Sequence, residues 1–113
     1  MSERTLDELA QMLERGGEPD DVLRGAVAIL AAEPGIGWAG IVFLEEGQLV
    51  LGPQAGEQDP ARRIRVPVEF QAEPVGEIWV DGDADPASLE RIAALVSAHV
   101  LIGWDTGGQA WEP

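Results

Sequence analysis

The stretch Gly37–Gly56, GWAGIVFLEEGQLVLGPQAG, is the longest apolar run of the 113-residue chain and constrains its fold most strongly. Glu45–Gln48 reads as a tight turn, because Gly47 tolerates the positive φ that a hairpin needs. The return strand is predicted over Gln48–Leu51 and should end at Gly52-Pro53, since proline offers no N–H to a strand partner. The first half alternates between two apolar faces, which predicts a central strand covered on both sides: Trp38, Gly40, Val42 and Leu44 on one, Ala39, Ile41 and Phe43 on the other.

Acidic residues dominate the charge of the chain. It has 21 acids against seven arginines, which gives a formal net charge of −14. Such a surface repels phosphate backbones and anionic lipids, so neither nucleic acid nor a membrane is expected as a partner. No apolar run approaches the 18 or so residues of a membrane span, and the polar N-terminal stretch does not resemble a signal peptide. We expect a cytoplasmic location.

The chain contains no cysteine and a single histidine, His99. The lack of cysteine excludes disulfides, thiolate metal sites and thiol catalysis together. The acidic groups at 20–21 and 81–85 lack the spacing of a Ca²⁺ loop and are better explained as helix caps and turn residues. We therefore predict no metal, no cofactor and no catalytic residue.

Two helices are expected before the hairpin. Thr5 and Glu8 form a capping-box pattern that opens the first helix, and Gly16-Gly17 ends it. The second helix opens at Glu18-Pro19, with Asp20 or Asp21 as N-cap, and ends at 33–35, Glu-Pro-Gly. Apolar residues recur along both helices with the period of one buried face.

The second half predicts a further hairpin and a last helix. Residues 62–70 alternate between apolar and charged side chains, and Pro67 favours a place at the sheet edge. Residues 75–81 pair with them. Asp85-Pro86 opens a helix that should end at Gly103. Its core stripe comprises Leu89, Ile92, Ala93, Val96 and Val100.

The order helix, helix, four strands, helix resembles a GAF domain, the small-molecule sensor relative of PAS. The likeness is strongest to the branch of the free methionine-(R)-sulfoxide reductases. Three pieces carry it: residues 38–56 with their W-x-G and LVLGP-x-x-G pattern, residues 64–68 with the VP pair, and residues 75–81 followed by the last helix. The resemblance implies an α+β fold, with an antiparallel sheet of four to five strands and two N-terminal helices and one C-terminal helix mainly on one face.

Two departures from that family bear on activity. Only ten residues separate Gly52 from Arg63, where the family has a long segment that roofs the pocket and, in the reductases, holds redox cysteines. Sulfoxide reduction by thiol chemistry is therefore excluded. Of the reductases' acidic pair on the final strand, Asp81 matches one member and Trp79 stands in place of the other. Arg63 stands where the family has an acid before the VP strand.

The candidate binding residues are Trp38, Trp79, Asp81 and Arg63. The tryptophans belong to neighbouring strands and form either a ligand platform or core packing. Arg63, together with Arg62 and Arg65, could receive an anion but is expected to pair across strands with Glu69 or Glu77.

The missing roof predicts that something else covers the open sheet face. We expect one domain over 1–103 and a Trp/Gly-rich tail over 104–113 that packs back on the domain or on a partner. We also expect a homodimer, because the last helix has a wide apolar face. The expected interface residues are Leu95, His99, Ile102, Trp104 and Trp111.

These observations favour a non-catalytic GAF-like binding or interaction module, sensor-like or accessory. Two alternatives remain open. One is a small-molecule binder that uses Trp38, Trp79 and Asp81. The other is an enzyme without thiol chemistry that acts through Asp81, Arg63 or His99.

Overall fold

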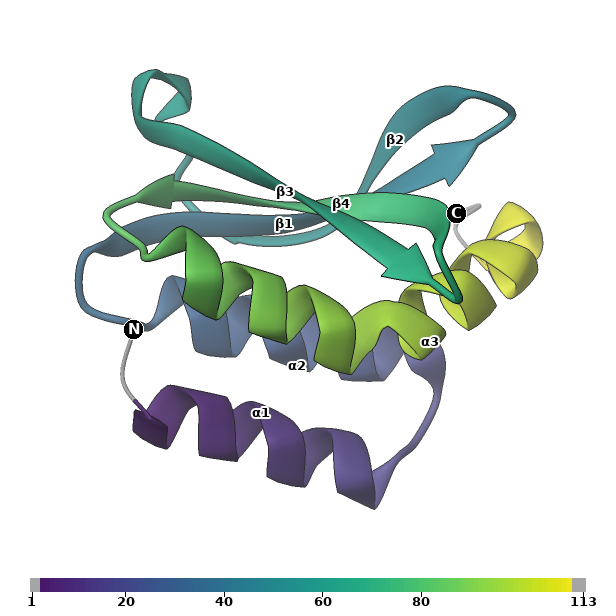
Figure 1. Cartoon of the computed structure of the whole chain (residues 1–113), viewed down its shortest axis with the longest axis horizontal. Coiled ribbons are helices and arrows are strands. Elements are labelled where there is room, and N and C mark those ends of the chain that lie inside the picture. The colour runs from purple at the N-terminus through teal and green to yellow at the C-terminus, as the bar shows by residue number, and fades with distance from the viewer. Residues whose placement is uncertain (1–2, 111–113) are drawn as a thin grey trace.

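The computed structural model describes residues 3–110, apart from the side chains of Pro19 and of residues 101–110. Its four strands form one antiparallel sheet in the order β2-β1-β4-β3, and the three helices lie on one face of that sheet (Figure 1). The predicted α+β architecture is confirmed. The elements are α1 (Glu3–Arg15), α2 (Pro19–Ala31), β1 (Ile36–Glu45), β2 (Gln48–Gly56), the 3₁₀ turn η1 (Pro60–Arg62), β3 (Arg63–Phe70), β4 (Glu73–Gly82) and α3 (Pro86–Ala110).

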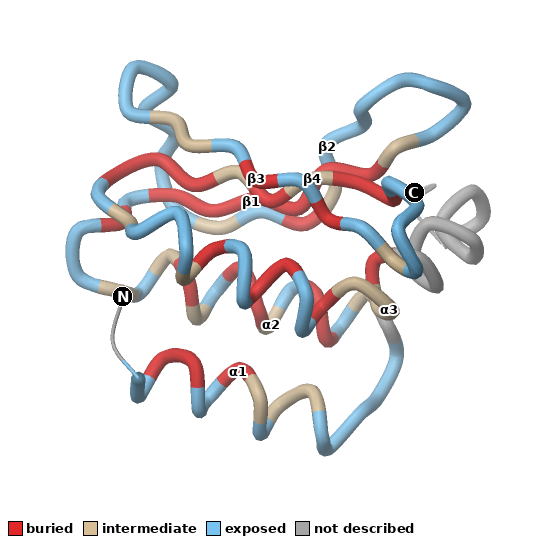
Figure 2. Tube along the Cα trace, viewed as in Figure 1, coloured by how far each residue is buried: buried red, intermediate tan, exposed pale blue. Residues whose placement is uncertain are grey.

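The hydrophobic core lies between the sheet and the helices (Figure 2). Strands expose alternate side chains to opposite faces, so every second residue of β1, β3 and β4 enters this core. The predicted α3 stripe is buried in full against it. The buried strand residues of this core are Ile36, Ala39, Ile41, Phe43, Val66, Val68, Val75, Ile78 and Val80.

Strand β2 is longer than predicted. Pairing to β1 continues beyond Gly52-Pro53, since Gly40 still pairs with Gln54, and the register shifts between Gly40 and Val42. The predicted end at Pro53 is wrong because β2 is an edge strand, where a bulge accommodates a proline without losing the rest of the ladder. Gly52 is required there because a β-carbon would lie 2.2 Å from the ring of Phe43.

The start of α1 also differs from the prediction. The helix begins at Glu3, so Thr5 lies within it and is no cap. The Thr5 hydroxyl instead donates a hydrogen bond to the carboxylate of Glu33, just beyond the C-terminus of α2. A side chain expected to begin a helix therefore joins two helices.

Glu18 occupies the N-cap position of α2 without a capping hydrogen bond from its side chain, and neither Asp20 nor Asp21 is the N-cap. Both aspartates lie in the first turn, where the helix dipole favours acids. Both also make ion pairs with Arg24, at 3.5 and 3.7 Å. The predicted start of α3 is confirmed: it begins at Pro86, and the Asp85 carboxylate accepts a hydrogen bond from the backbone N–H of Ala87.

The C-terminus of α3 lies farther along the chain than predicted. The helix continues through Gly103 to Ala110. One glycine inside a helix costs about 1 kcal/mol relative to alanine, which does not by itself end the helix. Packing of the tail against the domain falls outside the described side chains and stays a prediction. Within residues 3–110, no helix is both long and apolar enough to cross a membrane.

Candidate functional site

The face of the sheet opposite the helices, called the outer face below, carries the predicted binding residues. The cross-strand register places Trp38 beside Asp81, and Asp81 beside Arg63. The next row places Gly40 beside Trp79, and Trp79 beside Arg65. Residues from β1, β4 and β3 thus meet on one surface, although they lie up to 43 positions apart in the sequence.

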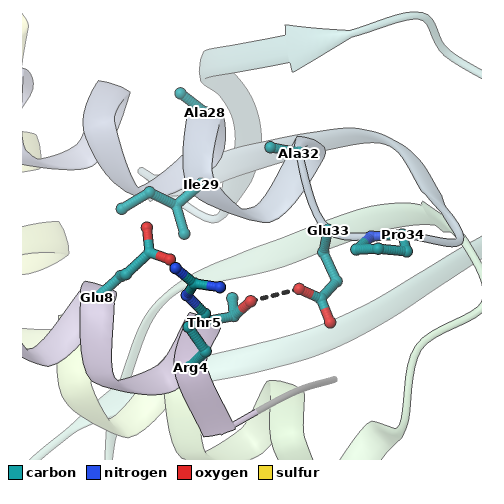
Figure 3. Close-up of a pocket in the computed structure, with 8 residues that line it drawn as sticks. All are labelled: Arg4, Thr5, Glu8, Ala28, Ile29, Ala32, Glu33 and Pro34. Atoms are coloured by element: carbon teal, nitrogen blue, oxygen red, sulfur yellow. Dashed lines mark hydrogen bonds between the residues drawn. The ribbon is translucent and has the colours of Figure 1, made fainter.

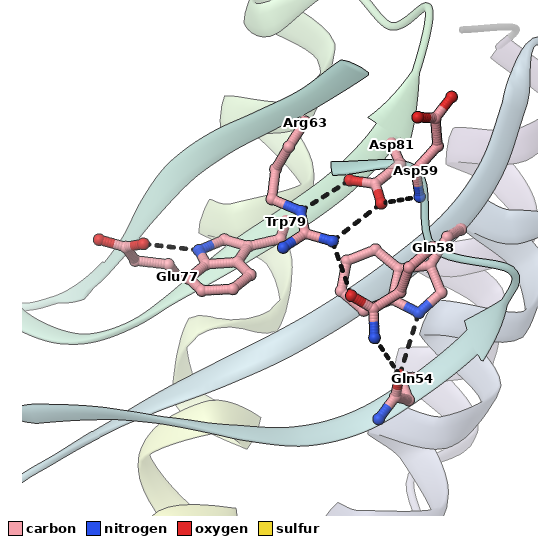
Figure 4. Close-up of polar contacts among 8 residues, drawn as sticks. Gln54, Gln58, Asp59, Arg63, Glu77, Trp79 and Asp81 are labelled. Carbon is pink, nitrogen blue, oxygen red and sulfur yellow. Dashed lines mark hydrogen bonds and ion pairs between the residues drawn. The ribbon is translucent and has the colours of Figure 1, made fainter. Parts of the chain in front are cut away.

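A bidentate ion pair between Arg63 and Asp81 forms the centre of this surface (Figure 4). Arg63 Nε lies 2.8 Å from Asp81 Oδ1, and one terminal guanidinium nitrogen lies 2.9 Å from Oδ2. Oδ2 also accepts a hydrogen bond of 2.7 Å from the backbone N–H of Asp59. Asp81 is only 1% exposed. The buried carboxylate is therefore satisfied entirely by the chain's own groups.

The two tryptophans hold the same guanidinium through their ring faces. The guanidinium carbon of Arg63 lies 4.7 Å from the Trp38 ring centroid and 5.1 Å from that of Trp79. Arg65 stacks on Trp79 at 4.3 Å. Such distances fall within the range of cation–π attraction. Trp38, Trp79 and Asp81 together form a cation cage, and Arg63 fills it.

Polar side chains from β2 and the loop before β3 close the cage. Trp38 is fully buried, and its indole N–H donates to Gln54 at 3.1 Å. Gln58 accepts a hydrogen bond of 2.9 Å from Arg63 and donates to Gln54 at 3.4 Å. The Trp79 indole donates to Glu77 at 2.6 Å. The end of β2 and the loop that follows it, residues 54–59, therefore cover Trp38.

Glycine at position 40 lets Trp38 lie flat along the sheet. A β-carbon there would approach the far edge of the Trp38 ring to 2.7 Å. Since any larger residue would displace the indole, the W-x-G pattern in the sequence has a direct packing reason.

Electrostatics favour the charged form of both members of the pair. The hydrogen bonds from Arg63, helped by the Asp59 N–H, hold the pKa of Asp81 below its usual value although burial acts in the opposite direction. The Asp81 carboxylate raises the pKa of Arg63 above its usual value. The pair stays ionised at neutral pH.

Some pairings predicted from the sequence are wrong. Arg63 pairs with Asp81 rather than with Glu69 or Glu77, and Arg62 pairs with Asp83 at 2.9 Å. Arg63 therefore uses its guanidinium within the fold. Gln54, Gln58 and Asp59 carry no sequence signal that would have connected them with Asp81, because their approach depends on how the loop folds over β1.

The predicted interface residues lie elsewhere. Leu95, on α3, is 42% exposed, and His99 is half-buried. Among the described residues, His99 Nδ1 has no hydrogen-bond partner. Because α3 lies on the helical side of the sheet, the structure does not bring His99 together with Asp81 or Arg63. The side chains of Ile102, Trp104 and Trp111 lie outside the described residues.

Two of the hollows that the described residues line lie away from the cage. One, of about 520 Å³, lies between α1 and the end of α2 and is lined by Thr5, Glu33 and six neighbouring residues (Figure 3). The other, of about 300 Å³, lies between β3 and α3. Neither is lined by Trp38 or Trp79. In the part of the chain that the structure describes, no group of three or more acidic or histidine side chains could hold a metal ion.

The fold is similar to those of solved structures. The type II free methionine-R-sulfoxide reductase from Thermoplasma acidophilum is 24% identical, with a TM-score of 0.62 over 73% of this chain and 91% of that one. The fRMsr of Staphylococcus aureus, in complex with substrate, is 17% identical, with a TM-score of 0.68 over 85% and 93%. The GAF domain of the Acinetobacter phosphoenolpyruvate-protein phosphotransferase is 15% identical, with a TM-score of 0.72 over 95% and 98%. No family model and no curated protein matches the sequence.

These likenesses confirm the predicted fold: the chain has a GAF-like fold, shared by a GAF domain and by reductases. At these identities they show the fold alone. The 113 residues contain no cysteine.

Proposed function

On this GAF-like fold, we propose that the chain is a non-catalytic binding or interaction module, sensor-like or accessory, whose outer-face site is filled by its own Arg63. The observation that carries the proposal is the buried Arg63–Asp81 pair held against Trp38 and Trp79. The absence of cysteine removes thiol chemistry, and the distance between the two faces of the sheet keeps His99 away from Asp81.

The energetics of the pair favour permanent occupation. A ligand that entered the cage would have to displace the guanidinium and separate it from Asp81. Separating the partners of a buried ion pair costs about 3–5 kcal/mol. Since 1.4 kcal/mol corresponds to a factor of ten, this would weaken a ligand's affinity by roughly two to three and a half orders of magnitude.

The cage also supports a second candidate, a small-molecule binder that uses Trp38, Trp79 and Asp81. Two aromatic ring faces beside a buried carboxylate match the chemistry of a cation. In this case the ligand is a guanidinium or ammonium compound, and Arg63 is withdrawn when it binds. An enzyme without thiol chemistry has no comparable observation in its favour.

Methylguanidinium distinguishes the two candidates. Wild-type protein and the Arg63→Ala variant are titrated with it, and the Tm is followed at constant ionic strength, with urea as the control solute. If Arg63 is a permanent occupant, the Tm of Arg63→Ala should rise with saturation while that of the wild type does not. Arg65→Ala is the matched control, because Arg65 stacks on Trp79 but makes no ion pair with Asp81.

A saturable rise in the wild-type Tm would instead support the small-molecule candidate. If neither protein responds, the cage does not recognise cations, and both versions of the proposal are wrong.

We also propose that the module forms a homodimer through the helical side of the sheet. The exposed Leu95 and the half-buried His99 on α3 support this arrangement.

A further inference from the structure

The two edges of the sheet differ in how they are protected. Edge strand β3 carries Arg63, Arg65 and Glu69 together with Pro67, the kinds of residue that discourage pairing with another strand. The opposite edge begins with Gln48–Leu51, which has no charge and no proline. No described strand pairs with this side of β2. We call Gln48–Leu51 the open edge.

The open edge is apolar on both faces. Leu49 and Val50 are each 43% exposed and Leu51 is 38% exposed. Leu51 pairs with Val42 and therefore faces outward, whereas Val50 pairs with Phe43 and faces the helical side. Within the described residues, the other exposed large hydrophobic side chain is Leu95. Exposed apolar surface is thus concentrated on one short strand.

The geometry limits what can pair there. The bulge at Gly52-Pro53 interrupts the ladder, so an added strand could pair continuously with only about four residues of β2. The turn end of the β1–β2 hairpin projects away from the helical layer (Figures 1 and 2), and the side chains on both faces of the open edge are exposed. A short extended segment fits this geometry.

The surrounding charges indicate the chemistry of the partner. Glu45, the last residue of β1, and Glu46, in the turn that follows, lie next to the open edge, and Glu77 lies on the outer face opposite Val42. A second copy would bring the same acids, and no basic side chain, in its own Gln48–Leu51 edge and adjoining turn. We infer that the open edge binds an extended apolar segment of another protein, flanked by lysine or arginine, as an added fifth strand. This inference rests on the proposed function as an interaction module.

A designed peptide tests the inference. The probe is fluorescein-labelled KRVTVTVRK, with EEVTVTVEE as the charge control and KRVTPTVRK as the control that cannot form a continuous strand. Binding to the 113-residue protein is measured by fluorescence anisotropy, and backbone amide shifts by NMR show where each peptide lies. We expect KRVTVTVRK to bind with a Kd below about 1 mM and to shift the amides of Gln48–Leu51, while both control peptides bind at least tenfold more weakly.

Matched variants distinguish binding at the open edge from non-specific binding of the peptide. Leu49→Lys introduces a charge at the open edge, whereas Ala61→Lys introduces the same charge at an exposed residue of η1. We expect Leu49→Lys to weaken binding at least tenfold and Ala61→Lys to leave it unchanged. Thermal melts confirm that both variants are folded.

The inference is overturned by any of three results: no binding up to about 1 mM, equal binding by the acidic control peptide, or equal loss in the two variants. The inference would also be overturned if the protein without peptide formed a dimer that Leu49→Lys abolishes, since a second copy would then occupy the open edge. The methylguanidinium experiment does not involve the open edge, so failure of the proposed function can be recognised separately.

Discussion

Replacing Arg63 by methionine should show how much the fold depends on the filled cage. The Asp81 side chain is fully buried and that of Arg63 is only 14% exposed. Methionine retains much of the aliphatic contact with the rings but removes the charge. The carboxylate then keeps only the hydrogen bond from the Asp59 N–H. Breaking a buried pair from one side costs about 3–5 kcal/mol.

That cost is large for a domain of this size. At about 4 °C per kcal/mol, the Tm should fall by roughly 12–20 °C. Urea unfolding at pH 7 gives the free energies of unfolding for wild type, Arg63→Met, Asp81→Asn and the double variant. We expect the double variant to be more stable than additivity predicts, by about 2 kcal/mol, because it leaves no unpaired buried charge.

Two results would refute this reasoning. A loss below about 1 kcal/mol in Arg63→Met would mean that Asp81 reaches water or another donor once Arg63 is gone. A coupling energy below about 0.5 kcal/mol would mean that the two side chains contribute independently. In either case the cage would not depend on its resident guanidinium.

Four further predictions follow from the described contacts. Arg63 lowers the pKa of Asp81 in the folded state, so the stability that the pair contributes is complete above the unfolded pKa of about 3.9 and is lost as the pH falls through the folded pKa. The loss of unfolding free energy in Arg63→Met, measured by urea melts, should therefore be smaller at pH 3.5 than at pH 7. An equal loss at both pH values would contradict this. Thr5→Val should cost about 1–3 kcal/mol in urea melts, because it removes the hydroxyl that bonds to Glu33; no change would mean that this bond does not hold α1 in place. Gly76→Ala should destabilise the fold by more than about 3 kcal/mol or prevent folding, since its β-carbon would lie 2.2 Å from the Val42 carbonyl oxygen. Gly47→Ala, in the turn between β1 and β2, meets no neighbouring atom and should cost only about 1 kcal/mol. Similar melting temperatures of the two variants would refute the steric argument. Native mass spectrometry should show a homodimer that Leu95→Asp weakens, and a monomer at every concentration would rule the dimer out.

Much of the fold could be predicted from local patterns. Alternation in residues 38–44 placed Ala39, Ile41 and Phe43 on one face and Trp38 and Val42 on the other, and the structure packs the first set into the core. The spacing of Leu89, Ile92, Val96 and Val100 predicted the buried stripe of α3. Both patterns express the fixed geometry of a strand or a helix, which depends on residues close in sequence.

The partner of Arg63 depends on register, which local patterns do not fix. A bulge between Val68 and Glu69 shifts the pairing of β3 with β4 by one residue. Without it, Arg63 would oppose Val80, and the arginines would face away from Asp81. The sequence suggested Glu69 or Glu77 instead, because nothing in residues 63–81 shows where the extra residue lies.

Residue types and short spacings were enough to predict the element order, the two faces of the central hairpin and the exclusion of thiol chemistry. They also placed Trp38 and Asp81 among the candidate binding residues. That Arg63 fills the space beside them, and that residues 54–59 cover Trp38, could be seen only in the folded chain. Those contacts join strands and loops distant in sequence, and they form only once bulges and turns have set the register.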